Sequence, residues 1–472
     1  MSTFGSINTA LSGLLAHRRA LDVIGHNIAN TATDGYSRRR VELSAVGGST
    51  VPAMYSRSTI SGNGVGVDGV TRIRDEFLEF AALRAHGSAA RLATESQMLL
   101  RIEQAVPEPS DVGMASQLGD FFAAWDDLAN TPSDSAARIA LLQQATTVSS
   151  SLHRVSTDLH GVRDGAVAEA STLVTEINSS AQQIAILNGA IGQATAAGLD
   201  PHDLSDQRDK LVLSLSDLIG VQARPGENGM VDITLGGTTL VRGNQAQQLQ
   251  VTETGPLSGP YAAAGMNAVE VQWAIDGYPA IVTEGRVAGL LASANVHVPE
   301  AISELDAVAA SLVSSVNALH QTGQGLDTVN DVGLNFWDPT GVTAETIRIS
   351  TDVAGQPSRI AGATAGAGAL DVTVAQKIAR LYSSLGGPGD VYQSMIGRLA
   401  VDTQALGRRS EIQLEVAAQS DEARLSVSGV NLDEELTALI TTQRAYEASA
   451  RLLTTVDQTL DTLINRTGLV GR

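Results

Sequence analysis

Three glycines have the spacing of a dinucleotide-binding fingerprint, since Gly64, Gly66 and Gly69 form a G-x-G-x-x-G pattern. Nucleotide binding requires a strand, a glycine turn and then a helix whose N-terminus faces the pyrophosphate. Here valines alternate with the glycines, and a period of two is typical of a hairpin strand. We therefore predict short strands and turns over 47–70 and no nucleotide site.

The histidines offer acid–base or metal chemistry only where other groups accompany them. His153 and His160 are seven residues apart, which is not the spacing of four found in a helical metal pair. His320 could act as a base, but no serine, cysteine or carboxylate constellation accompanies it in the sequence. We predict that His320 closes a helix end through hydrogen bonds.

Aspartates recur at every third position from Asp200 to Asp209, which could suggest a cation site. We predict instead a capped loop that leads into a short helix, with Arg208 and Lys210 as ion-pair partners. The loop at 327–333 lacks the bidentate glutamate that a calcium loop carries at its twelfth position. Neither segment predicts a metal site.

The sequence contains no motif of a known catalytic class. It has no phosphate loop, no G-x-S-x-G elbow and no H-E-x-x-H, and neither Lys210 nor Lys377 follows a glycine turn. We therefore predict that the protein is not an enzyme, and that it has no catalytic, cofactor-binding or metal-binding residues.

The composition indicates protein partners. The chain has 472 residues, enough for two to four domains, and its 31 basic and 51 acidic residues give a net charge of −20. This charge argues against nucleic-acid binding and against an anionic membrane surface. No stretch approaches 18 consecutive apolar residues, so we also predict no membrane insertion.

Cysteine is absent, which excludes disulfides and thiolate zinc sites. The N-terminus lacks the pattern of a cleaved signal peptide, and this by itself indicates a cytoplasmic protein. Aromatic residues make up only 3% of the chain. Such a composition suits long helices packed through small side chains.

The two ends of the chain carry matching helical patterns. Apolar residues recur at steps of three and four over 428–468, and the N-terminal stretch 4–28 keeps the same spacing. Asn431 can cap the C-terminal helix, and Glu434 can close a capping box. The apolar residues predicted to pair the two helices are Phe4, Ile7, Leu11, Leu14, Leu21, Ile24 and Ile28 at one end and Leu436, Leu439, Tyr446, Leu453, Leu460 and Ile464 at the other.

Burial of the seven N-terminal side chains contributes roughly 10–20 kcal/mol, at about 1.5–3 kcal/mol each. Ordering the backbone of about 29 residues costs roughly 1–2 kcal/mol per residue. We therefore predict that neither terminus folds alone and that both are disordered in the monomer.

Between the ends, helical periodicity alternates with strand periodicity. Patterns of three and four over 134–198, 286–321 and 390–428 predict long helices, with a possible bend of the first at Gly161 or Gly165. A period of two takes over within 221–282. The predicted fold is α+β, with terminal helices paired in a coiled-coil-like bundle, a long helical second domain and an inserted antiparallel β-rich domain. The predicted domains are 1–35 plus 430–472 (terminal helices), 36–215 plus 286–325 and 372–429 (long helices with a short β-hairpin), 216–285 (β-rich) and 326–371 (a short β/loop insertion).

The run HNIANTATDGYSRRR at 26–40 resembles the NIANxxTxGY signature that follows the first helix in axial proteins of the bacterial flagellum. Asn27, Asn30, Gly35 and Tyr36 carry the resemblance.

Three further segments resemble one branch of these proteins, the hook-associated protein 1 family. They are DLSDQRDKLV at 203–212, the Asn317/His320/Gly323 motif followed by Phe336 and Trp337, and SGVNLDEE at 428–435, which contains Asn431, Asp433 and Glu434. The resemblance covers most of the chain.

The resemblance implies a structural subunit that joins the flagellar hook to the filament and assembles as a ring through its paired terminal helices. It implies three partners besides the protein itself: the hook protein, the second hook–filament junction protein and a cytoplasmic export chaperone that engages the C-terminal helix. The implied location is the extracellular flagellum, reached uncleaved through the flagellar type III secretion channel.

Two alternatives stay open at this point. A hook or distal-rod subunit shares the N-terminal signature but polymerises into long tubes. An extracellular coiled-coil adhesin or scaffold would bind a ligand through its β-rich domain.

Overall fold

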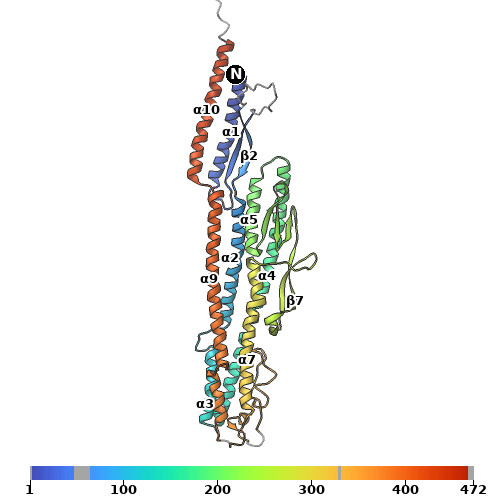
Figure 1. The fold of residues 1–472 in the computed structure, drawn as a ribbon, viewed down its shortest axis with the longest axis vertical. Coiled ribbons are helices and arrows are strands. Elements are labelled where there is room, and N and C mark those ends of the chain that lie inside the picture. Colours follow the sequence, from blue (N-terminus) through green and yellow to red (C-terminus); the bar gives the residue numbers. More distant parts are fainter. Residues whose placement is uncertain (1–2, 47–63, 328–330, 369, 466–472) are drawn as a thin grey trace, which may run out of the picture.

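The computed structural model describes residues 3–46, 64–327, 331–368 and 370–465. The molecule is a long rod, and the helices from both ends of the chain lie side by side at one end of it (Figure 1). These helices are α1 (Thr3–Ala29) and α10 (Leu432–Asn465). The predicted pairing of the terminal helices is therefore confirmed.

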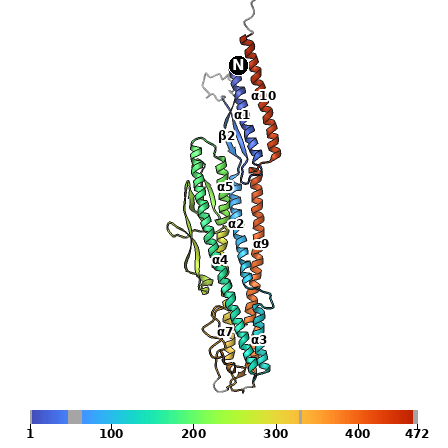
Figure 2. The ribbon, with the colours of Figure 1, turned by 180° about the vertical axis from the view of Figure 1, so that it is seen from behind.

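Long helices form the shaft of the rod, and Figures 1 and 2 show them running along its length. Their bounds are α2 (Glu76–Ala105), α3 (Met114–Asn130), α4 (Ser135–Ala196), α5 (His202–Ile219), α6 (Gly285–Ala292), α7 (Val298–His320), α8 (Thr373–Ala379) and α9 (Pro388–Ser428). The helix does not break at the predicted bend, since α4 is continuous through Gly161 and Gly165. The segment at 200–209 forms the start of an 18-residue helix, longer than the short one predicted.

The predicted helix over 286–321 is interrupted by a π-helical turn, Ser293–His297, between α6 and α7. Within this turn the Asn295 side chain reaches the neighbouring strand, where its Oδ1 accepts from Val269 N at 2.8 Å and its Nδ2 donates to Val269 O at 2.8 Å. The wider turn therefore docks the helix to the β-rich region. Single π turns of this kind commonly mark a local functional or packing demand.

The β-rich region packs on α4, on the side of the rod away from α9 (Figures 1 and 2). Asn178 and Asn188 of α4 each bond backbone groups there, at Leu249 and Val231 respectively. The strands are antiparallel, as predicted. Their bounds are β3 (Gln222–Pro225), β4 (Val231–Leu235), β5 (Thr238–Arg242) and β6 (Gln245–Ala246) in one sheet and β7 (Leu249–Pro256) and β8 (Asn267–Trp273) in another.

A separate hairpin next to α1 pairs β1 (Arg39–Ala45) with β2 (Val65–Arg72). The glycine pattern at 64–69 lies at the start of β2, so the predicted hairpin strand is confirmed there and no helix follows the glycines directly. The rest of that predicted segment, 47–63, lies outside the described residues. The domain boundaries given above stay a prediction.

Aromatic side chains concentrate at the end of the rod opposite the termini. Phe121 and Trp125 of α3 are fully buried against the Phe336–Trp337 pair, with ring centroids 5.2–5.8 Å apart across this contact. The loops around them include the short strands β9 (Gly323–Gln324) and β10 (Ala363–Thr364). This end of the molecule therefore has a dense core despite the low aromatic content of the chain.

Within the described part of the chain, one helical stretch, Gly285–His320, is long and apolar enough to cross a membrane by length and composition. Its apolar positions Leu305, Leu312 and Val316 are fully buried in the protein core. Core helices pass such a test, so this finding does not indicate a membrane span.

Three shaft helices meet at His86 of α2. Its Nδ1 lies 2.9 Å from a carboxylate oxygen of Asp217 in α5, and its Nε2 lies 2.9 Å from one of Asp421 in α9. The hydrogen bond with Asp217, then the one with Asp421, outweigh the effect of burial and raise the pKa of His86 from 6.5 to about 9. His86 is therefore a charged clamp at neutral pH.

Because the folded pKa of His86 exceeds the unfolded value, the clamp should stabilise the shaft fully below pH 6.5 and lose this contribution as the pH rises through 9. We expect the melting temperature of the wild type to fall by about 1–3 °C between pH 6.5 and 9.5 relative to that of His86→Gln. The measurement is thermal unfolding followed by circular dichroism. The same pH dependence in both proteins would contradict a charged clamp.

Candidate assembly interface

The contact face of α10 follows a heptad pattern. Steps of four and three from Glu435 to Leu460 select only positions that are buried or half-buried. These positions are Glu435, Leu439, Thr442, Tyr446, Ser449, Leu453, Val456 and Leu460. The face contains the polar residues Glu435, Thr442 and Ser449 among its apolar ones, so it is less apolar than a typical coiled-coil seam.

Small residues of α1 let the two helices approach closely. Ala10 and Ala16 are 1% exposed, and a Cβ built on Gly13 would lie 3.1 Å from Ser449 Oγ. Where the helices come this close, they touch through backbone atoms and β-carbons and not through large apolar side chains. The pair therefore buries little apolar surface for its length.

The structure places the predicted pairing residues in three groups. Ile24 is buried, and half-buried positions are Ile7, Leu14, Leu21, Ile28, Leu439, Tyr446, Leu453 and Leu460. Leu11, Leu436 and Ile464 are exposed, at 43%, 47% and 76%, so the α1–α10 contact does not bury them. Phe4 lies in α1, but its side chain is outside the described part of the structure. The periodicity missed Ala10, Ala16, Val23 and Val456, which are all buried.

Asn27, at the end of α1, is 1% exposed and uses its whole side-chain amide. Its Nδ2 donates to Arg39 O at 2.9 Å and to Glu435 Oε2 at 3.0 Å. Its Oδ1 accepts from the Tyr36 hydroxyl at 2.9 Å and from Arg39 N at 3.0 Å. One side chain thereby joins α1, β1 and α10.

Glu435 completes this group, which we call the Asn27 node (Asn27, Tyr36, Arg38 and Glu435). The Glu435 residue is 2% exposed, and its Oε1 accepts from Arg38 Nε at 2.7 Å. Arg38 also bonds the exposed Glu434 at 2.6 Å, and its backbone N donates to Ser428 O at 2.8 Å. The prediction stopped at Glu434. Glu435 lies four residues before Leu439, on the same face of α10, but only the position of α1 shows that this is the contact face.

The other predicted motif residues shape the two turns beside the node. Asn30 Nδ2 donates to His26 O at 2.9 Å at the end of α1, and Gly35 has φ +82°, which favours glycine. Asn431 caps α10 as predicted, because its Oδ1 accepts from Asp433 N at 3.0 Å. The predicted capping box is replaced by the pair between Glu434 and Arg38.

The aspartates at 203–209 face the hairpin. Asp203 and Asp206 pair with Arg39, and Asp206 and Asp209 pair with Arg72, which stands opposite Arg39 in the strand register. Of the predicted partners, Arg208 does bond Asp209 at 2.9 Å. The other one, Lys210, pairs with Asp34 of the turn after α1.

A second apolar surface of the terminal helices faces solvent. Leu11 and Leu15 of α1 and several residues of α10 are 43–54% exposed. The α10 residues are Leu432, Leu436, Ile440, Leu452 and Leu463. These side chains leave apolar area available for contacts outside this chain.

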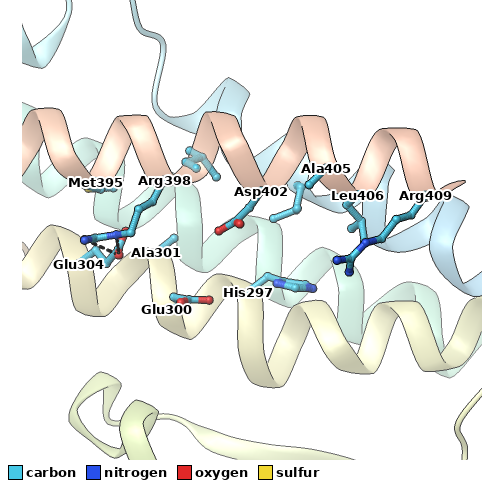
Figure 3. Close-up of a pocket in the computed structure, with 12 residues that line it drawn as sticks. His297, Glu300, Ala301, Glu304, Met395, Arg398, Asp402, Ala405, Leu406 and Arg409 are labelled. Carbon is cyan, nitrogen blue, oxygen red and sulfur yellow. Dashed lines mark hydrogen bonds and ion pairs between the residues drawn. The ribbon is translucent and has the colours of Figure 1, made fainter.

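A groove between α7 and α9 is lined by both charged and apolar side chains (Figure 3). It has a volume of about 280 Å³, and Arg398 of α9 pairs with Glu304 of α7 across it at 2.6 Å. Glu300, Asp402 and Arg409 also line it, but it contains no nucleophile beside a base. Within the described ranges, no cluster of three or more histidine or carboxylate side chains could hold a metal ion.

His320 is buried and structural, as predicted. Its Nδ1 donates to Leu334 O at 2.7 Å, and its Nε2 accepts from Ala361 N at 2.9 Å. Burial lowers the pKa of His320 to about 4, so the ring is neutral. Asn317, one turn earlier in α7, holds the neighbouring loop, since its Oδ1 accepts from the backbone N of Phe336 and Trp337 at 3.0 and 2.9 Å.

The middle and the two ends of the chain match different protein-family models. Residues 99–337 match the model described as "Flagellar hook-associated protein FlgK helical domain". The ends match two other models, "Flagella basal body rod protein" at 7–36 and "Flagellar basal body rod FlgEFG protein C-terminal" at 422–466. A hook protein FlgE from Caulobacter vibrioides is 56% identical over 41 residues, which is 9% of this chain. The likeness to this hook protein is therefore local.

Relatives over the full length are hook-associated proteins. Flagellar hook-associated protein 1 of Bacillus subtilis (strain 168) is 30% identical over 520 residues, covering 100% of both chains. The protein of that name from Salmonella typhimurium is 26% identical and covers 97% of this chain and 99% of its own. These full-length matches overturn the adhesin and hook or rod alternatives.

The fold agrees with a solved structure, that of the flagellar hook junction protein FlgK from Burkholderia pseudomallei. The TM-score is 0.61 at 17% identity, over 74% of this chain and 100% of that one. Together with the full-length relatives, this match shows that the chain belongs to the flagellar hook-associated protein 1 (FlgK) family, the structural, non-enzymatic subunits of the hook–filament junction in the extracellular flagellum.

Proposed function

We propose that the paired terminal helices α1 and α10 are the element through which this subunit assembles into a ring between hook and filament. The observation that carries the proposal is the pair itself, which is weakly packed inside and apolar outside. Its inner face relies on small residues around Gly13, while Leu11, Leu436 and other apolar side chains are exposed. Copies packed side by side would bury the outer face.

The same weakness supports the proposal that the termini are disordered in the monomer. Of the α10 contact face, only Glu435 and Val456 are buried in the single chain. The apolar area gained by pairing is therefore small compared with the entropy of ordering two long helices. Contacts with neighbouring copies would supply the remaining stabilisation.

Limited proteolysis of the soluble monomer tests this disorder. Trypsin should cut at Arg18 and Arg444 in the terminal helices at least tenfold faster than at Arg154 and Arg408 in α4 and α9, because all four side chains are exposed and only backbone order distinguishes them. The cleavage sites are identified by mass spectrometry over time. Equal cleavage rates at the four arginines would show that the termini are folded in the monomer.

We further propose specific partners. The hook protein would contact the ring on one side and the second junction protein on the other, and an export chaperone would cover the apolar face of α10 before secretion through the flagellar type III channel without cleavage. The exposed Leu432, Leu436 and Ile440, spaced by four residues, give the chaperone an apolar helix face to bind. Failure of the chaperone to co-purify with the full chain, while it binds a known client, would remove it from the partners.

Neighbouring leucines of α10 offer a matched test of the pair. Leu453 is half-buried on the contact face, whereas Leu452 is 47% exposed. Incubated with isolated hooks, tagged wild-type protein should form one band at the distal tip in electron micrographs. Leu453→Asp should reduce tip labelling at least tenfold, because burial of an unpaired carboxylate opposes pairing with α1.

The control Leu452→Asp keeps the contact face intact but changes the outer face. It should leave the α1–α10 pair formed while lowering occupancy of complete rings. Full tip labelling by Leu453→Asp would contradict assembly through this pair. Long homopolymers of the wild type would contradict a ring at the junction.

The Asn27 node gives a second matched pair, the adjacent Glu434 and Glu435. Glu435→Gln removes the charge that accepts from Arg38 and Asn27 in a buried site, which should cost about 1.5–3 kcal/mol of pairing free energy. Hook-tip binding, measured as a function of protein concentration, should weaken by about tenfold or more. Glu434→Gln, with a side chain that is 59% exposed, should change binding by less than about threefold. Equal effects of the two substitutions would show that the buried node does not control assembly.

A further inference from the structure

We infer that the β1–β2 hairpin is held on the long-helix shaft by an ionic ladder before the termini fold, and that it then serves as the docking platform for α1 and α10. The inference rests on the proposed folding of the termini upon assembly. It assigns the hairpin strands to the preformed part of the monomer.

The ladder joins three arginines of the hairpin region to three aspartates on one face of α5. Asp203, Asp206 and Asp209 are spaced by three residues, so they follow each other along the helix. Asp206 takes the central place, since its two oxygens lie 3.1 Å from Arg39 Nη2 and 2.9 Å from Arg72 Nη1.

The outer rungs lie on either side of Asp206. Arg39 Nη2 also bonds Asp203 at 2.5 Å, and Arg72 Nη1 also bonds Asp209 at 2.7 Å. Arg74, just past the end of β2, pairs with both Asp209 and Glu79 of α2. The hairpin is therefore attached to α5 through both of its strands, and Arg74 links the end of the hairpin to α2.

Partial burial makes these pairs stronger than ordinary surface pairs. The side chains of Arg39, Arg72 and Asp206 are 10%, 14% and 10% exposed. Burial alone would raise the pKa of Asp209, but the charges of Arg74, Arg208 and Arg72 hold that pKa below its usual value. The carboxylate is thus ionised at neutral pH. Removing one partner would leave a partly buried charge unpaired.

The opposite side of the hairpin region offers its polar groups to the termini. Arg39 presents its backbone N and O to Asn27, and the Arg38 guanidinium reaches Glu435. Val65 N is 3.2 Å from the acceptor Ser12 Oγ of α1. The bonds to α5 use the arginine side chains, so they do not need α1 or α10. A docked hairpin would hold these groups ready and fix the angle at which the terminal helices leave the shaft.

Hydrogen exchange of the full-length monomer, read by mass spectrometry, tests the platform. In the wild type, peptides covering β1 and β2 should be protected like those of α5, while α1 and α10 exchange near the unfolded rate. Asp206→Asn, which weakens both central rungs, should accelerate exchange of the hairpin about tenfold or more. Asp200→Asn, an exposed aspartate just before α5, should change it by less than about twofold.

Two further measurements distinguish loss of the ladder from unfolding of the shaft. Peptides of α2 and α5 report whether Asp206→Asn remains folded, and added 1 M salt should accelerate hairpin exchange in the wild type more than in Asp206→Asn, because the Debye length falls to about 3 Å. A wild-type hairpin that exchanges as fast as α1, or an unchanged hairpin in Asp206→Asn, would overturn the platform. Protected α1 and α10 would overturn the proposed disorder, whereas the comparison of the two aspartate variants would still report on the ladder.

Discussion

The structure at the end that carries both termini depends on the side-chain amide of Asn27. This group is buried, and both of its donor hydrogens and both acceptor positions are used by three different elements. If a buried amide loses even one hydrogen-bond partner, the desolvation of the unpaired group destabilises the fold. The helices α1 and α10 therefore have one register in which the Asn27 node is satisfied. Apolar packing through alanine and glycine could tolerate several registers, so the polar group supplies the specificity that the seam lacks.

Helix α10 shows which features of this end of the rod could be predicted from the sequence. The sequence predicted the helix from its apolar spacing and the cap from the residue type of Asn431. It predicted the pairing with α1 because both ends of the chain carry matching apolar patterns. It did not select the contact face, because α10 has apolar residues on two sides and Leu436 satisfies a repeat of three and four as well as Leu439 does. The observed contact face includes the polar residues Thr442 and Ser449. A search for apolar periodicity does not select polar positions. Identifying that face required the position of α1.

The long-range pairs show the same limit. The spacing of Asp203, Asp206 and Asp209 was visible, and their role as ion-pair partners was predicted, but the partners named were the nearest basic residues in the sequence. The main partners, Arg39 and Arg72, are about 130 or more residues away and meet only because β1 and β2 pair in register. By contrast, the structural role of His320 could be predicted without knowing its partners, because the sequence contains no catalytic motif that includes it. The groups that bond its ring, Leu334 O and Ala361 N, are 14 and 41 residues away and come from the structure alone.

Apolar burial is concentrated in the shaft and is low at the end that is proposed to assemble. Phe121, Trp125 and Trp337 lie in the core at the far end, and Ile177, Leu215 and Ile233 lie in a second core where the β-rich region packs on the shaft. The hairpin is then attached through ion pairs, and α1 meets α10 through glycine, alanine and the Asn27 node. Because stabilisation per residue follows buried apolar area, local unfolding should begin at the termini and stop at the shaft. A chain with few aromatic residues thereby confines its strongest packing to the shaft, which agrees with the proposal that the terminal helices need neighbouring copies for their stability.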